Sequence, residues 1–134
     1  MKKIPYGKSD IVQILAENYY YVDKTRFIPL IEQAGDYLFF LRPRRFGKSL
    51  WLATLETYYD ILNKDKLTAI FKDTWISENL TPDAGKYFIL RFNFAMVDPN
   101  PDRVEESFNF TCLQSIKKFA TIFSIPSMFC IMGT

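Results

Sequence analysis

The stretch that decides the predicted fold is Tyr37-Leu-Phe-Phe-Leu-Arg-Pro-Arg-Arg-Phe-Gly-Lys-Ser-Leu50. Its first five residues, 37–41, are apolar or aromatic and carry no charge, as in a strand that is covered on both faces of an α/β sheet. A basic turn follows, and a helix can begin at Gly-Lys-Ser. Strand, basic turn and helix in this order are typical of a phosphate-binding P-loop. We therefore expect an α/β fold, namely an incomplete parallel sheet of the P-loop NTPase type with flanking helices.

The residues after the apolar run suit the binding of a nucleoside triphosphate. A bound anion needs converging backbone N–H groups, a helix N-terminus, a mobile ammonium group and a hydroxyl for magnesium. Lys48 offers the ammonium, Ser49 offers the hydroxyl for Mg²⁺, and the residues before them offer the N–H groups. The predicted ligands are therefore ATP and Mg²⁺, and the predicted nucleotide-binding residues are Arg44, Arg45, Phe46, Gly47, Lys48 and Ser49.

Only the second half of the strict P-loop pattern is present, because Arg42 stands where that pattern has glycine. The helix after the loop is supported by apolar residues that recur on one face, at positions 51, 55, 58, 59 and 62. A basic surface turn before an ordinary amphipathic helix is the alternative. Arg44 and Arg45 either add charge beside the triphosphate or are solvated loop residues, and Phe46 is expected to pack under the loop.

Composition excludes several kinds of site. The chain has 134 residues and no histidine, so Ser-His-Asp catalysis and His-liganded metal sites cannot be built from it. Its two cysteines, Cys112 and Cys130, form no Cys-x-x-Cys pair. The 17 Lys and Arg residues against 15 Asp and Glu leave a net charge of +2, too small to recruit nucleic acid by a long-range field. Any function that depends on positive charge must therefore use a local cluster of Lys and Arg residues.

The length allows one domain or part of one. The basic N-terminus lacks the apolar run of a signal peptide, and no run of about 18 apolar residues is present, so we expect a cytoplasmic protein that does not cross a membrane.

Outside the loop, the pattern predicts three further helices and one further strand. Ser9 is a candidate N-cap for a short helix that contains Ile11 and Ile14. A second helix should begin near Pro29 and end at Gly35. The segment 87–94, Tyr-Phe-Ile-Leu-Arg-Phe-Asn-Phe, is the second strong strand candidate, and a long helix is expected over 102–123.

Four segments of the chain resemble the AAA-ATPase-like family of prokaryotic proteins. They are Ile4-Pro-Tyr-Gly-Lys-Ser-Asp10, Asn18-Tyr-Tyr-Tyr-Val-Asp-Lys-Thr25, Phe40-Leu-Arg-Pro-Arg-Arg-Phe-Gly-Lys-Ser-Leu50 and Leu90-Arg-Phe-Asn-Phe94. The resemblance runs in order to about Phe119, and Arg42 at the first-glycine position is usual in that family. It implies an N-terminal arm over residues 1–36 and a P-loop core over 37–134.

The resemblance also implies a Walker B strand, which ends in acidic residues, and often a downstream restriction-nuclease-like domain. This sequence contains neither, so we expect an N-terminal fragment that is truncated before Walker B. Asp98 follows an apolar run, but it begins a Pro-Asn-Pro turn, and Glu105 and Glu106 are better explained as charges at a helix N-terminus. ATP hydrolysis by this chain alone is therefore not expected.

Two other functions remain open at this point. Arg42, Arg44, Arg45 and Lys48 could grip nucleic-acid phosphates without any nucleotide chemistry. The chain could also be a non-functional truncated product with exposed apolar sheet edges. Salt separates nucleotide binding from nucleic-acid binding, because contacts to a phosphate backbone weaken steeply as salt rises.

Overall fold

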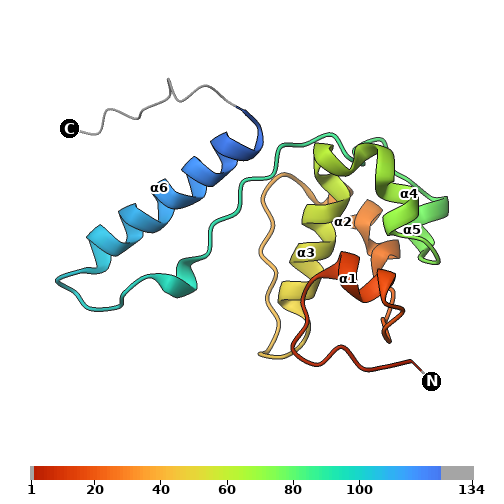
Figure 1. Ribbon diagram of the computed structural model, residues 1–134, viewed down its shortest axis with the longest axis horizontal. Helices are drawn as coiled ribbons and strands as arrows, with labels where there is room; N and C mark the ends of the chain where they lie inside the picture. The colour runs from red at the N-terminus through yellow and green to blue at the C-terminus, as the bar shows by residue number, and fades with distance from the viewer. Residues whose placement is uncertain (1, 125–134) are drawn as a thin grey trace. The chain divides into compact units, whose positions relative to one another are not determined.

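The computed structural model describes residues 2–124, and the chain forms two compact units, residues 1–87 and residues 88–134. The first unit contains α1 (Ile11–Ala16), η1 (Thr25–Phe27), α2 (Ile28–Ala34), α3 (Lys48–Tyr59), η2 (Ile61–Lys66), α4 (Leu67–Ile70) and α5 (Trp75–Glu78). The second contains η3 (Phe94–Met96) and α6 (Val104–Ile122). Figure 1 shows these helices along the chain.

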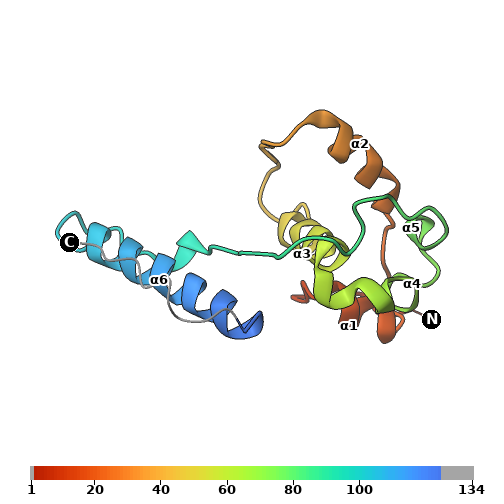
Figure 2. The same cartoon turned by 90° about the horizontal axis from the view of Figure 1, so that it is seen from above.

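The hydrophobic core of the first unit forms around α3. Both views show α1 lying beside α3 (Figures 1 and 2), and the two helices are in contact. The core is contributed by nearly every helix of the unit and consists of Ile11, Ile28, Trp51, Tyr58, Leu67, Phe71 and Ile76. Because most of these helices are short, packing of their apolar faces supplies most of their stability.

Local sequence sets the ends of the first two α-helices. The Asp10 carboxylate accepts hydrogen bonds from the backbone N–H groups of Val12 and Gln13 at 2.9 and 3.4 Å, so Asp10, and not the expected Ser9, is the N-cap of α1. Pro29 lies in the first turn of α2, and Gly35 ends this helix with a φ of 118°. The predicted bounds of the second helix are thereby confirmed.

The C-terminus of α3 is held by the chain that returns past it. The backbone N–H groups of Gly85 and Tyr87 donate to the carbonyl oxygens of Tyr58 and Tyr59, both at 2.9 Å. These bonds satisfy carbonyls that a helix end leaves without partners. Gly85 has a φ of +61°, and a Cβ there would lie 2.8 Å from Cα of Lys64, so this close approach requires glycine.

The second unit is held together by aromatic contacts. The rings of Phe92 and Phe94 stack with centroids 5.8 Å apart, and Phe94 stacks on Phe108 of α6 at 5.1 Å. At the other end of α6, Phe123 contacts Phe88 and Phe119, with 4.8 Å between centroids in each pair. None of residues 88–124 is buried. The helix expected over 102–123 is confirmed as α6.

The expected α/β fold with a parallel sheet is wrong for the described residues, which are mostly helical and contain no named strand. Their one β-type contact is an isolated parallel bridge between Asp60 and Tyr87. A strand exists only when a neighbouring strand satisfies its backbone groups, and no described segment pairs with residues 37–41 or continues pairing beyond Tyr87. The apolar run 37–41 is therefore exposed, not covered on both faces.

Candidate functional site

The ammonium group of Lys48 spans the predicted phosphate-binding loop. Lys48 begins α3, and its Nζ donates to the carbonyl oxygen of Arg42 at 2.6 Å and to that of Pro43 at 3.1 Å. Both acceptors lie at the start of the loop, five and six residues earlier in the chain. The Lys48 ammonium group thus links the start of the loop to the start of α3. Because this side chain is only half buried, it can also reach a ligand.

The N-terminus of α3 leaves backbone donors available. Gly47 is its N-cap, with φ 75° and ψ 22°, and no side chain of the described residues caps the helix. The first bonded amide is that of Trp51, which donates to the carbonyl of Gly47 at 2.9 Å, so the N–H groups of residues 48–50 keep no partner among the described residues. Unpaired N–H groups and the positive end of the helix dipole favour an anion at this place.

The loop backbone also takes an unusual conformation before Gly47. Arg45 has a φ of +65°, which a residue with a side chain adopts at a cost of about 1–3 kcal/mol. Left-handed residues within a turn point successive N–H groups toward one side and form a concave nest for anions. A Cβ built on Gly47 would meet no atom within 4 Å, so the space beside the loop is open.

The surroundings of the loop carry positive charge. Arg42, Arg44 and Arg45 are exposed, and none of them forms a salt bridge with a carboxylate of the described chain. Phe46 is 62% exposed, so the expectation that it packs under the loop is wrong. Ser49 follows Lys48 on the first turn of α3 and is exposed. The six predicted residues, which are consecutive in the sequence, thus form one continuous loop and helix start, and all of them except the half-buried Lys48 are exposed.

The remainder of α3 fixes this helix in the core. Trp51, Thr54 and Tyr58 are buried on one face of the helix. The hydroxyl of Thr54 donates to the carbonyl of Leu50 at 2.8 Å, and burial raises the pKa of Tyr21. The loop is therefore mounted on a rigid element, which is what a binding site needs for precise geometry.

A polar network that the sequence did not predict anchors the C-terminal end of α3. The Glu32 carboxylate accepts from the hydroxyls of Tyr59 and Thr81 at 3.0 and 2.7 Å. The hydroxyls of Thr81 and Tyr58 lie 2.9 Å apart, and the Thr81 amide donates to the Tyr58 hydroxyl at 2.8 Å. Burial and the neighbouring Glu32 raise the pKa of Tyr59. No local signal reveals the network, since Glu32 and Thr81 are 49 residues apart.

The Asp23-Lys-Thr25 segment has a structural role. One oxygen of Asp23 accepts from the backbone N–H and hydroxyl of Thr25 at 2.8 and 2.7 Å. Its other oxygen accepts from the backbone N–H of Trp75 at 2.7 Å, and Ile76 donates to the hydroxyl of Thr25 at 3.1 Å. Asp23 and Thr25 therefore also satisfy backbone N–H groups at the N-terminus of α5, about 50 residues further along the chain.

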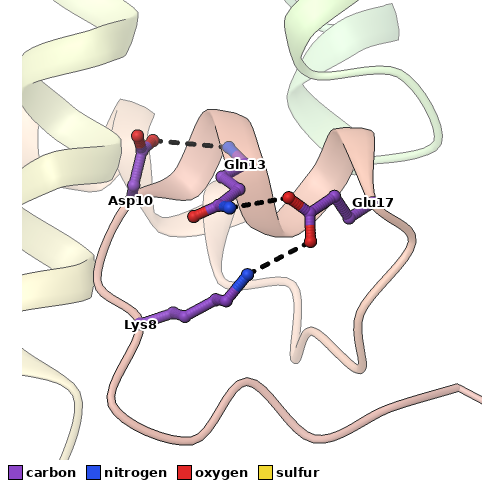
Figure 3. A network of polar contacts seen from close by, with 4 residues as sticks. All are labelled: Lys8, Asp10, Gln13 and Glu17. Atoms are coloured by element: carbon purple, nitrogen blue, oxygen red, sulfur yellow. Dashed lines mark hydrogen bonds and ion pairs between the residues drawn. The ribbon is translucent and has the colours of Figure 1, made fainter.

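The N-terminal segment forms a second polar network, on α1 (Figure 3). Lys8 donates to one oxygen of Glu17 at 3.1 Å, and the Gln13 amide donates to the other at 2.6 Å. The Lys8 ammonium also lies 4.4 Å from the ring centroid of Tyr19. Hydrogen bonds from Gln13 and Lys8 lower the pKa of Glu17. An open hollow of about 310 Å³ beside this network is lined by Lys2, Lys3, Glu17, Asn18 and Tyr19, and by no residue of the loop.

Acidic residues of the second unit serve local structure. The Asp98 carboxylate accepts from the backbone N–H of Asn100 at 3.0 Å, as expected for a turn. Glu105 and Glu106 lie in the first turn of α6, which confirms the helix N-terminal position predicted for them. Within residues 2–124, no group of three or more acidic or cysteine side chains could hold a metal ion, and no helix is long and apolar enough to cross a membrane.

Comparison with known proteins gives two matches. A family model described as predicted AAA-ATPase matches residues 5–127. A protein of Azotobacter chroococcum mcd 1, described only as an uncharacterized protein in the vnfD 5′ region, is 55% identical over 56 residues. That match spans 40% of this chain and 11% of the length of the relative. No solved structure matches.

Proposed function

The chain belongs to the predicted AAA-ATPase family, and from this premise we propose that residues 42–49 bind a nucleoside triphosphate together with Mg²⁺. The observation that carries the proposal is the position of the Lys48 ammonium, held across the loop by the carbonyls of Arg42 and Pro43 beside uncapped N–H groups of α3. In this position the lysine is oriented before a ligand arrives, so little side-chain entropy is lost on binding.

Each loop residue has a defined role in the proposed complex. The amides of residues 48–50 donate to phosphate oxygens, and the Lys48 ammonium neutralises phosphate charge. The hydroxyl of Ser49 is a hard oxygen ligand of the kind that Mg²⁺ accepts alongside phosphates and water. Arg44 and Arg45 are exposed next to these groups and add positive charge. Open space beside Gly47 fits the close approach of a phosphate group to the backbone.

The proposal covers binding and not hydrolysis. Phosphoryl transfer to water needs a residue that orients the attacking water and a carboxylate that orders the metal ion. The loop itself contributes neither. The residues of the loop bind the nucleotide, orient its phosphates and neutralise their charge.

Titration with a fluorescent ATP analogue in the presence of Mg²⁺ tests the proposal. Lys48→Ala should weaken binding at least about tenfold, because a lost charged hydrogen-bonding partner costs about 1.5–3 kcal/mol. Lys72→Ala is the control, since Lys72 is an exposed lysine of the same unit that lies outside the loop. Ser49→Ala should remove the dependence of affinity on Mg²⁺. Equal affinity of Lys48→Ala and Lys72→Ala would refute the assignment.

The exposed arginines favour one second candidate, namely binding of nucleic-acid phosphates by Arg42, Arg44, Arg45 and Lys48. The same titration distinguishes it when repeated between 50 and 200 mM salt. Binding to a phosphate backbone through several contacts should fall steeply over this range, whereas a triphosphate cradled with Mg²⁺ should lose much less affinity. A labelled single-stranded oligonucleotide serves as the competing probe.

A further inference from the structure

We draw no further inference here: the strongest candidate, the open hollow beside α1 that is lined by Lys2, Lys3, Glu17, Asn18 and Tyr19, contains no buried side chain, and nothing in the structure shows what binds in it or covers it.

Discussion

The two units of the chain differ in how their apolar residues are used. In the first unit, seven hydrophobic side chains from most of its helices form a buried core around α3. In the second, none of residues 88–124 is buried, and the aromatic contacts there are between partly exposed rings, with Phe88 against Phe123 and Phe94 against Phe108. The described part of the second unit thus contains the 19-residue helix α6 but no buried residue. A rich supply of aromatic residues is therefore not sufficient for a core, which needs elements that cover each other from several sides.

This difference has a consequence for the candidate site. The loop 42–47 and α3 belong to the unit with the core, and α3 contributes Trp51 and Tyr58 to it. Regions with few buried contacts open locally at low free energy, whereas core elements open only with the whole unit. We therefore expect α3 to hold the loop in place even when α6 opens.

A matched pair of phenylalanine substitutions tests the difference most strongly. Phe71→Ala removes a fully buried ring and should destabilise the first unit by about 3–5 kcal/mol. Phe108→Ala removes a ring that is 44% exposed and should cost about 1 kcal/mol, the value of an aromatic pair. Trp51 and Trp75 both lie in the first unit, so their fluorescence during urea unfolding reports on that unit. An equal shift of the tryptophan transition by both variants would contradict the comparison.

A pair of glycine substitutions tests how closely the chain packs against the end of α3. Gly85→Ala should cost about 2–3 kcal/mol, because a left-handed φ of +61° is combined with a Cβ 2.8 Å from backbone of Lys64. Gly7→Ala has a similar φ of +71° but no atom within 4 Å, and it should cost about 1 kcal/mol from conformation alone. Thermal unfolding of both variants measures the difference. Equal losses would mean that the close approach to Lys64 contributes nothing.

The smallest expected effect concerns the pH dependence of the first unit. Burial and Glu32 raise the pKa of Tyr59 above the ordinary value of 10.0, so the folded state holds its proton more tightly than the unfolded state. This stabilisation is complete below pH 10 and is lost as the pH rises through the folded-state pKa. Tyr59→Phe should cost about 1 kcal/mol at pH 8, where the hydroxyl donates to Glu32, and should flatten the decline in stability above pH 10.

Urea unfolding at pH 8, 10 and 11 measures this slope. Tyr6→Phe serves as the control, because the Tyr6 side chain is 97% exposed. If the free energy of unfolding of Tyr59→Phe falls with rising pH as steeply as that of Tyr6→Phe, Tyr59 does not contribute to the alkaline loss of stability.

How well the sequence predicts an element depends on whether the residues that determine it are neighbours in the sequence or lie far apart in it. The bounds of α2 follow from Pro29 and Gly35, and α6 follows from its apolar face and its first-turn carboxylates, all of which are local signals. Strands are not local, because a strand needs a neighbour that composition does not reveal. The run 37–41 has the residues of a buried strand, yet it lies exposed without a pairing partner among the described residues. The prediction of a sheet failed at this step.

The candidate site follows the same rule. The start of a helix at the Gly47-Lys48-Ser49 tripeptide was predictable, and α3 does begin at Lys48. The bonds from Lys48 to Arg42 and Pro43, and the left-handed Arg45, depend on how the loop folds back, which the residue pattern does not specify. The contacts from Glu32 to Thr81 and from Asp23 to Trp75 connect distant residues and could not be predicted from one sequence.

Amide hydrogen exchange with and without Mg²⁺ and ATP tests the central claim most directly, because it locates the ligand on the chain. Nucleotide should slow exchange at the amides of residues 44–50, among which those of residues 48–50 are proposed to donate to phosphate oxygens, and should leave α6 unchanged. Lys48→Ala, measured in parallel, should lose most of this protection. Protection that appears elsewhere while residues 44–50 exchange at the same rate, or no change at saturating nucleotide, would contradict the assignment of this loop as a nucleotide-binding site.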